Sequence, residues 1–346
     1  MCNIAGYIGN RRAAPILIEM LRRQQIYDGG LATGIATVHE GKLYMRKVAG
    51  NLDELLRDTD AIDLPGNVGI IHTRPGNSPA NYTHPHISED GQLAVVLNGT
   101  VENDKYYDLR AKTAQMAEAA GYGYVAKAYD CCKCFPELSD GAHVPEGEQI
   151  AHLTAMYKKE GKSYTEAFKL AVEGGYTDLV AVMLTANDPD KIRACRISRP
   201  MVACVGEGES FIASCEYAFG EDIVGTKFSL PALSVCEIKK DGVTVTGERV
   251  GIEPVAEPTP RTYALGMELL SAFLKEQKEI GGAYFDKLEL FLKAHKDELF
   301  DGGYTYSQYA RLVYELIYQL EREGKLFGEV RPAPKGNRDL RYMWID

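Results

Sequence analysis

Apolar residues form short continuous or alternating runs through the first 250 residues of the chain. Runs of this kind predict strands near residues 3–9, 68–73, 92–97, 178–186, 191–197, 201–206 and 210–214. Apolar residues at helical spacing predict helices over residues 12–27, 103–120, 148–159 and 163–173. Hairpin turns are predicted at Glu40-Gly41 and Asp241-Gly242. The pattern alone indicates a mixed α and β protein with two strand-rich blocks, each followed by helices.

The pattern changes to mostly helical after a Pro-rich linker at residues 253–260. Helices are predicted over residues 261–280, 284–299 and 307–324, followed by two extended runs at 327–331 and 340–345. We therefore expect two domains, residues 2–252 and 261–346. A set of helices closed by a hairpin is similar to a winged helix. Such a module either binds nucleic acid or packs against protein.

Charge and composition narrow the function classes. The net charge of −10 does not favour broad nucleic-acid binding. Arg331, Lys335, Arg338 and Arg341 make the last hairpin basic, but the tail as a whole is near charge balance, so a packing or dimerisation module is the favoured interpretation. No run approaches the roughly 18 apolar residues of a membrane span, and no signal peptide is evident. We expect a cytoplasmic homo-oligomer whose eight cysteines are reduced.

The most informative single residue is the second one, Cys2. Removal of Met1 would leave a thiol and a free α-amine on the same residue. An α-amine has a reference pKa of roughly 7.7–8.0, so it can accept a proton near neutral pH. One residue would then carry both a nucleophile and its general base, as an N-terminal threonine does. The alternative is that Cys2 occupies this position by accident, because a single cysteine is weak evidence.

Two apolar runs end in residues that suit amide chemistry. The first, residues 68–73, is followed by Arg74, and the second, residues 92–97, by Asn98-Gly99. A side-chain amide and a glycine N–H at the end of a buried strand can hold a developing oxyanion, which is often the largest catalytic contribution. Asn-Gly is also a common turn pair, and without Cys2 the turn would be the favoured interpretation.

The chain resembles the class II glutamine amidotransferases, which are N-terminal nucleophile hydrolases, over about residues 2–250. The resemblance is strongest to the glutaminase domain of the glucosamine-6-phosphate synthases. It rests on an ordered set of motifs, namely Cys2, the helix of residues 15–27, Gly34-Ile35-Ala36, Ile71-His72-Thr73-Arg74, His84-Pro85-His86, Asn98-Gly99 with Glu102-Asn103, residues 148–153 and residues 211–214. The resemblance implies an α+β fold, a four-layer αββα sandwich.

The resemblance also implies roles for particular residues. Cys2 would attack the side-chain amide of glutamine, and its α-amine would serve as base and then as acid. Asn98 and Gly99 would form the oxyanion hole. Arg74 would pair with the α-carboxylate through two hydrogen bonds, which its planar fork allows. His86 is a further expected substrate-binding residue. No cofactor and no metal are implied.

Several positions depart from the family pattern. Asn3 replaces the glycine that usually follows the cysteine, and Asp28 stands where the family has an arginine. The loop at residues 75–79 is shorter than its family counterpart. Glu146 falls where the family has the aspartate that binds the α-amine of glutamine. The extra methylene moves the carboxylate by about an ångström, and a misplacement of that size can cost about a hundredfold in rate. We expect either an altered substrate preference or weakened catalysis.

An insertion at residues 122–144 contains Cys131, Cys132, Cys134 and His143. Three thiols and an imidazole can ligate zinc in principle. The spacing does not match a paired Cys-x-x-Cys site, so a loop bordering the glutamine pocket is the favoured interpretation.

Two functions follow from different classes. The first is an enzyme that hydrolyses glutamine or a related amide and passes ammonia to a separate partner protein, because only about 90 residues follow the linker and an isomerase does not fit there. The second is a glutaminase-fold sensor or regulatory subunit with little turnover. An N-terminal cysteine acylase for other amides is a third. Intact Cys2, Asn98 and Gly99 favour the first.

Overall fold

The structure is a computed structural model that describes residues 2–25, 29–74, 79–99, 106–176, 178–252, 257–300, 306–332 and 338–346. Several positions named above lie outside these residues, namely Met1, Asp28, residues 75–78, Glu102-Asn103, residues 253–256 and Lys335. The side chains of Arg331 and Arg338 also lie outside the description.

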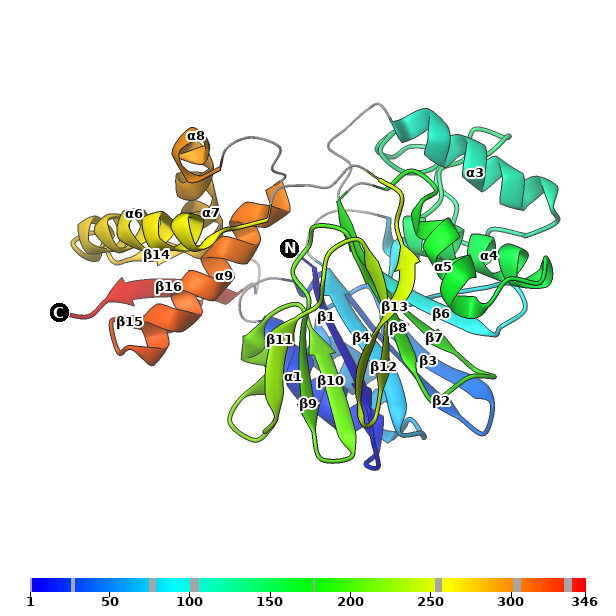
Figure 1. The fold of residues 1–346 in the computed structure, drawn as a ribbon, viewed down its shortest axis with the longest axis horizontal. Coiled ribbons are helices and arrows are strands. Elements are labelled where there is room, and N and C mark those ends of the chain that lie inside the picture. Colours follow the sequence, from blue (N-terminus) through cyan, green and yellow to red (C-terminus); the bar gives the residue numbers. More distant parts are fainter. Residues whose placement is uncertain are drawn as a thin grey trace.

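Two antiparallel sheets stack face to face in the larger part of the molecule (Figure 1). The first has the strand order β11-β9-β10-β1-β4-β2-β3, formed by Thr226–Ser229, Val202–Gly206, Glu209–Ala213, Asn3–Ile8, Val68–Arg74, Ala32–His39 and Lys42–Val48. The second has the order β13-β12-β8-β7-β6-β5, formed by Gly242–Arg249, Ser234–Lys239, Ile192–Arg196, Leu179–Thr185, Leu93–Gly99 and His86–Ile87.

Helices cover the outer face of each sheet. The first sheet carries α1 (Ala13–Gln25) and α2 (Leu52–Asp58), and the second carries α3 (Tyr107–Ala119), α4 (Glu146–Lys159) and α5 (Tyr164–Val172). Short 3₁₀ turns occupy Ala61–Asp63, Ala80–Tyr82 and Glu216–Phe219. The result is the four-layer αββα sandwich that the resemblance implied.

The central strands are buried on both faces, which explains why they are continuous apolar runs rather than alternating ones. Successive side chains of a strand point to opposite faces. In β4, Ile70 packs between the two sheets, whereas Ile71 packs under α1. In β6, Val96 packs between the sheets and Leu97 packs under the helices of the second layer.

Register brings the polar ends of these strands together. Strand β1 pairs with β4 so that Asn3 lies opposite Thr73. The residues that precede β1 and end β4 are therefore neighbours at one edge of the sandwich. Strands β1 and β4 of the first sheet both contact β6 of the second. Cys2, Arg74 and Asn98 consequently meet at the tips of three strands.

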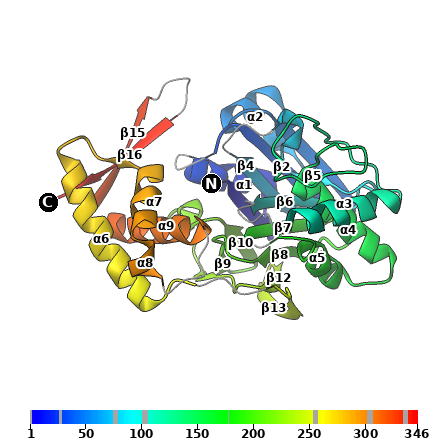
Figure 2. The same ribbon diagram turned by 90° about the horizontal axis from the view of Figure 1, so that it is seen from above.

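The C-terminal residues form a smaller module beside the sandwich (Figures 1 and 2). Its elements are α6 (Pro260–Lys278), β14 (Ala283–Tyr284), α7 (Phe285–Ala294), α8 (Lys296–Leu299), α9 (Tyr306–Arg322), β15 (Leu326–Pro332) and β16 (Arg338–Trp344). The three strands form a sheet in the order β14-β16-β15, and the module has a hydrophobic core that includes Leu288, Leu312, Leu316 and Tyr342.

The sequence patterns predicted most elements at nearly the observed positions, and the exceptions have local causes. The single helix predicted over residues 284–299 is divided at His295, which ends α7 and precedes α8. The two-residue strands β5 and β14 are too short to show periodicity. Helix α2 was not predicted, although Asn51 forms a capping box with Glu54 at its start. No helix in the described part of the chain is long and apolar enough to cross a membrane.

Candidate active site

The side chain of Asn98 links the tip of β6 to the residue that precedes β1. Its Nδ2 donates a hydrogen bond to the backbone carbonyl oxygen of Cys2 at 3.0 Å. Asn98 is 1% exposed, whereas Cys2 is partly exposed and has a free thiol. A buried amide donor is thus held next to a partly exposed cysteine whose thiol is itself desolvated.

Charged groups surround the Cys2 thiol. Burial raises the pKa of this thiol above its ordinary value of 9.0, while the positive charges of Arg199 and Arg74 lower it and the carboxylate of Glu146 raises it. The net direction is upward, so the thiol is protonated near neutral pH. A nucleophilic reaction at this sulfur therefore requires a nearby base to remove the proton.

Arg74 is the last residue of β4 and is 6% exposed. Its Nη2 donates to the carbonyl oxygen of Pro79 at 3.0 Å, which ties the guanidinium to the segment that follows the loop. Burial lowers the pKa of Arg74, and the neighbouring Cys2 acts in the opposite direction. A guanidinium in such a place remains charged, because its reference pKa is above 12.

Glu146 is the first residue of α4. Burial raises the pKa of its carboxyl group to about 7, although the positive charge of Arg110 lowers it. Arg110 is itself 2% exposed and lies over the ring of Tyr107, with 5.0 Å between its Cζ and the ring centroid. The carboxyl group therefore changes its protonation state near neutral pH.

Sequence reasoning missed two residues of this cluster, Arg199 and Asp178. Arg199 Nη1 donates to Asn98 Oδ1 at 3.2 Å, and Arg199 Nη2 donates to Asp178 Oδ2 at 3.1 Å. The signal that pointed to Arg74, a cation soon after an apolar run, is also present for Arg199, because it follows β8 after two intervening residues. What could not be read was that β8, β7 and β6 are consecutive in the second sheet.

His86 lies in a stack of buried imidazoles. The ring centroids of His72 and His84 are 4.4 Å apart, and those of His84 and His86 are 4.6 Å apart. Burial lowers the pKa of His72 and of His86 to about 3, so both rings are neutral near pH 7. A Cβ on Gly147 would approach both His84 and His86 to 2.8 Å, so only glycine fits there. The substrate-binding role of His86 stays a prediction.

Gly99 ends β6, where it pairs with Leu179. A Cβ at this position would lie 3.3 Å from the carbonyl oxygen of Asp178, which is tighter than ordinary contact. Glycine therefore allows the tip of β6 to approach the residue that also binds Arg199. The role of the Gly99 N–H stays a prediction.

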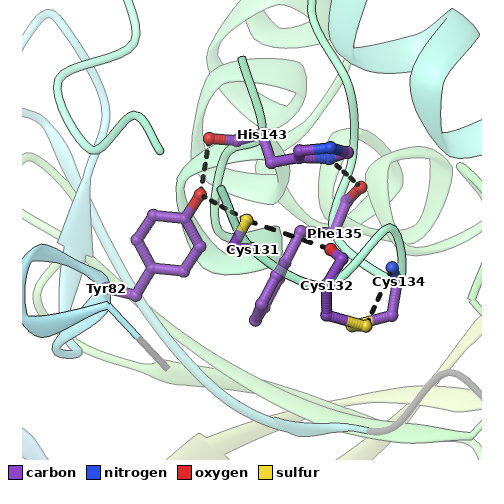
Figure 3. The surroundings of a disulfide bond; sticks show 6 residues. All are labelled: Tyr82, Cys131, Cys132, Cys134, Phe135 and His143. Atoms are coloured by element: carbon purple, nitrogen blue, oxygen red, sulfur yellow. Dashed lines mark hydrogen bonds between the residues drawn. A yellow bond between two sulfur atoms is a disulfide. The ribbon is translucent and has the colours of Figure 1, made fainter. Parts of the chain in front are cut away.

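The cysteine-containing insertion packs against Tyr82, which follows the loop after β4 (Figure 3). The Tyr82 hydroxyl donates to the carbonyl oxygen of His143 and lies 3.9 Å from Cys131 Sγ. Cys132 and Cys134 form a disulfide. The prediction of reduced thiols is therefore wrong for this pair. Their Cα atoms are 5.1 Å apart, within the range that a disulfide requires, because the chain turns tightly between them.

The disulfide also changes the zinc hypothesis, because two of the three thiols are already bonded to each other. The His143 ring is turned to the carbonyl oxygen of Phe135, with 3.1 Å between that oxygen and Nδ1. Within the described residues, no group of three or more His, Cys, Asp or Glu side chains is arranged to hold a metal ion.

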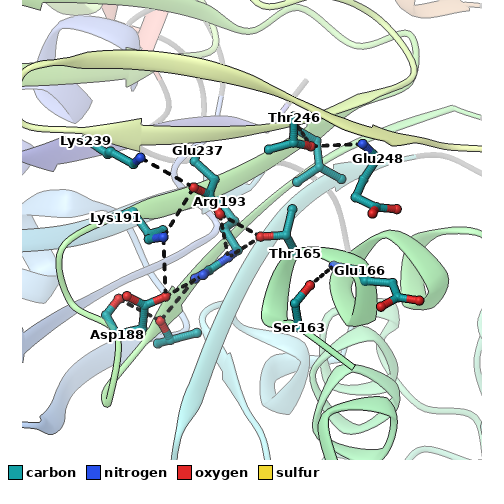
Figure 4. A network of polar contacts seen from close by, with 12 residues as sticks. Ser163, Thr165, Glu166, Asp188, Lys191, Arg193, Glu237, Lys239, Thr246 and Glu248 are labelled. Carbon is teal, nitrogen blue, oxygen red and sulfur yellow. Dashed lines mark hydrogen bonds and ion pairs between the residues drawn. The ribbon is translucent and has the colours of Figure 1, made fainter. Parts of the chain in front are cut away.

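A second polar network lies toward the other end of β8 (Figure 4). Arg193 is 3% exposed and donates to Asp188 and to Thr165 of α5. Thr165 donates in turn to Glu237 of β12 at 2.7 Å, and Glu237 also accepts from Lys191 at 3.3 Å. The network joins a helix to two strands.

The fold is shared with solved structures of glutamine amidotransferases. A glutamine phosphoribosylpyrophosphate amidotransferase from B. subtilis aligns with a TM-score of 0.58 and 17% sequence identity, over 80% of this chain and 58% of that chain. The two stacked antiparallel sheets and their outer helices are those of the N-terminal nucleophile hydrolases. The fold class is thereby defined.

Curated relatives match over most or all of the chain. The isomerizing glutamine–fructose-6-phosphate aminotransferase of Pyrococcus horikoshii is 33% identical over 372 aligned residues, which cover 100% of this chain and 55% of that relative. The enzyme of the same name from Streptomyces coelicolor is 35% identical over 257 residues, covering 71% of this chain and 37% of that relative. Over its whole length the chain is related to these glutamine-dependent aminotransferases, and it shares the fold of solved glutamine amidotransferases. It spans about half or less of the length of these relatives. No protein-family profile matches it.

Proposed function

We propose that this protein hydrolyses the side-chain amide of glutamine, with Cys2 as the nucleophile. One observation carries the proposal. The tips of β1, β4 and β6 bring together a free thiol, a buried amide donor and an arginine, in Cys2, Asn98 and Arg74. This set supplies a nucleophile, an oxyanion donor and a carboxylate-binding group within a single cluster.

The chemistry begins with the removal of Met1. The freed α-amine takes the proton from the Cys2 thiol. A base is needed for this step, because burial raises the pKa of the thiol and keeps it protonated. Sulfur bonds to the amide carbon, and the negative oxygen of the tetrahedral intermediate accepts hydrogen bonds from Asn98 Nδ2 and the Gly99 N–H. The carbon–nitrogen bond then breaks as the α-amine gives its proton to the leaving nitrogen. Water hydrolyses the thioester and releases glutamate.

Two charged residues would bind the amino-acid end of the substrate. Arg74 pairs with the α-carboxylate, and Glu146 pairs with the α-ammonium. Without a bound ligand, burial raises the pKa of Glu146 to about 7. A bound ammonium group would favour the charged carboxylate, which supports this assignment. The extra methylene of glutamate compared with aspartate sets where that ammonium can lie.

We also propose that the ammonia passes to an acceptor on a separate partner protein and that the chain forms a homo-oligomer. The names of the relatives state that they transfer nitrogen from glutamine to fructose 6-phosphate. In this chain the residues from α6 onward form a small module with its own core, beside the sandwich. We assign no nucleic-acid ligand to this module, because α9 faces the sandwich through an ion pair between Arg311 and Glu257 and through a ring contact between Tyr318 and Tyr217.

A sensor with little turnover is the second candidate. Glu146 in place of aspartate favours it, because the extra methylene changes the shape of the amino-acid pocket relative to the family pattern. In that function the protein would bind glutamine or a related amide, and the C-terminal module would transmit the bound state.

Labelling by 6-diazo-5-oxo-L-norleucine, a reactive glutamine mimic, separates the candidates. Intact mass before incubation reports whether Met1 has been removed. We expect one covalent adduct in the wild type, none in Cys2→Ala, and an undiminished adduct in Cys131→Ser, which removes the other partly exposed free thiol. Labelling together with glutamate release supports the enzyme. A processed chain that binds glutamine without labelling supports the sensor, and a processed chain that does neither contradicts both.

A further inference from the structure

The starting observation is a buried arginine that reaches two different acceptors. Arg199 is 2% exposed, and its two terminal nitrogens donate to Asn98 Oδ1 at 3.2 Å and to Asp178 Oδ2 at 3.1 Å. Asp178 also accepts a hydrogen bond from the Ser198 hydroxyl. The carboxylate balances the charge of the guanidinium, which would otherwise be costly to bury.

This contact decides which way the Asn98 amide points. An asparagine side chain has an oxygen that accepts and a nitrogen that donates, and rotation by half a turn exchanges them. A guanidinium only donates. The amide oxygen must therefore face Arg199, and the Nδ2 group must face Cys2, where it donates to the carbonyl oxygen at 3.0 Å. The opposite orientation would present an oxygen to a developing oxyanion and would repel it.

Arg199 is held in turn by a neighbour that reaches the C-terminal module. Arg196 Nε donates to the backbone carbonyl oxygen of Arg199 at 2.8 Å. Arg196 Nη2 lies 2.8 Å from each carboxylate oxygen of Glu257. The same carboxylate forms an ion pair with Arg311 of α9, and Arg311 also pairs with Glu315 at 3.0 Å.

Apolar packing between the two parts is incomplete at this point. A cavity of about 80 Å³ lies beside the ion pairs and is lined by residues of both parts, among them Pro200, Ser214, Cys215, Arg311 and Tyr314. The Glu257 bridge therefore connects α9 to the segment that carries Arg199 beside this cavity, while Cys215 packs into the apolar core of the C-terminal module. A second polar contact between the parts, from the Tyr217 hydroxyl to Glu321, does not involve Arg196 or Arg199.

We propose that Arg199 is a positioning residue that fixes the Asn98 amide for oxyanion binding, and that Arg196, Glu257 and Arg311 make this position depend on the docking of α9. The proposal rests on the proposed function only where it concerns turnover. The orientation of the Asn98 amide is a property of the protein without substrate.

The first test compares Arg199→Lys with the wild type. Lysine keeps the charge next to Asp178 but replaces a planar fork by a single point donor. We expect kcat for glutamine hydrolysis to fall about a hundredfold, as for loss of an oxyanion-hole donor, with KM unchanged. Alkylation of Cys2 by iodoacetamide, which needs no oxyanion hole, should keep its rate. Equal loss of alkylation would overturn the proposal, because it would mean a damaged nucleophile.

A double-mutant cycle with Asn98→Ala adds a readout that a merely structural role would not move. If Arg199 acts through Asn98, Arg199→Lys should have no further effect on kcat in the Asn98→Ala background. Additive losses of kcat would overturn the proposal. The pair Arg199→Met with Asp178→Asn, which removes both charges together, covers the case in which the single variant fails to fold.

A second measurement does not depend on turnover. In protein labelled with ¹⁵N-asparagine, the side-chain amide signal of Asn98 can be assigned by its loss in Asn98→Ala. We expect its hydrogen exchange to be slow in the wild type and about fivefold to thirteenfold faster in Arg199→Lys, since loss of a hydrogen bond of about 1–1.5 kcal/mol changes the opening equilibrium by that factor. Unchanged exchange would overturn the proposal. A wild type without turnover or labelling would instead contradict the proposed function and leave this readout decisive.

Two matched variants test the link to α9 in the full chain. Glu257→Gln breaks the bridge between Arg196 and Arg311, whereas Tyr217→Phe removes a contact between the same two parts away from it. We expect Glu257→Gln to lower kcat about fivefold and to speed exchange of the Asn98 amide, while Tyr217→Phe changes neither. Equal effects of the two variants, or no effect of Glu257→Gln, would overturn this part of the proposal.

Discussion

Two buried arginines, Arg193 and Arg199, lie six positions apart in the chain and do different things. Arg193 is surrounded by Asp188, Glu237 and Thr165, so its donors are matched by carboxylates and a hydroxyl from neighbouring elements. Arg199 divides its donors between one carboxylate and a neutral amide, Asn98. The contacts of Arg193 with carboxylates hold a helix and two strands together. The contact of Arg199 with the Asn98 amide instead fixes the orientation of that amide.

The largest expected effect is at the nucleophile. Cys2→Ala should abolish glutaminase activity, because the reacting sulfur is gone, and should leave the melting temperature close to that of the wild type. The residue precedes β1 and is partly exposed, so its removal leaves no cavity in a core. Activity assays and circular dichroism melts check both halves. Retained activity in this variant would contradict the mechanism.

The comparison of the two arginines sharpens with Arg193→Met. Removal of the guanidinium takes one cation away from Asp188 and Glu237, and breaking a buried ion pair costs about 3–5 kcal/mol. Both carboxylates retain Lys191, which moderates the loss. We expect chemical denaturation to give a reduced free energy of unfolding, while kcat of the folded protein stays at the wild-type value. A fall in kcat comparable to that of Arg199→Lys would remove the distinction drawn here.

Arg74→Lys tests whether Arg74, the arginine at the end of β4, binds the α-carboxylate of the substrate. Lysine keeps the charge but loses the two-point contact with a carboxylate, which is worth about 1.5–3 kcal/mol. KM for glutamine should therefore rise about tenfold to a hundredfold, with a smaller effect on kcat. Steady-state kinetics measure both, and an unchanged KM would assign Arg74 to the support of the Pro79 segment instead.

The smallest effect concerns the pH dependence that Glu146 imposes. Its pKa of about 7 means that the carboxylate that binds an ammonium group is present above that pH and is lost below it. KM for glutamine should fall as pH rises through about 7, and this dependence should vanish in Glu146→Gln. A KM that does not vary between pH 6 and pH 8 in the wild type would contradict the role of Glu146.

The same group has a calculable influence on stability. Its pKa in the folded protein is raised from 4.5 to about 7, so the folded state favours the protonated form. The stability it contributes is complete below pH 4.5 and is lost as pH rises to about 7. Above that pH, Glu146→Gln should be more stable than the wild type by about 1–3 kcal/mol. At pH 4 the two proteins should unfold alike.

The sequence was sufficient to place two of the candidate residues at the ends of strands, while their roles stay predictions. Arg74 and Asn98 could be predicted because each comes at the end of a continuous apolar run, and the runs themselves mark strands buried on both faces. Arg199 has a similar local signal, but its partner depends on which strands are neighbours in the second sheet. Sheet order is set by contacts distant in sequence, and no local pattern records it.

Other features were missed for different reasons. The disulfide between Cys132 and Cys134 depends on a tight turn in an insertion without periodicity. The histidine stack requires His72 of one sheet to meet His84 and His86 of another segment, which only the packing of the two layers brings about. The need for glycine at position 147 becomes clear only from the packing of these rings, since a Cβ there would overlap them.

The double burial of β4 and β6 has a consequence for how such a protein can diversify. Ile70, Ile71, Val96 and Leu97 each serve a core, so the strands themselves admit little change. Residues 79–83, which follow the loop after β4, belong to none of those cores, whereas the cysteine-containing insertion contributes Tyr124, Leu138, Ala142 and Val144 to the core under the second sheet. A designer could therefore exchange residues 79–83 to accept other amides, while the strands and the buried part of the insertion keep Cys2 in position.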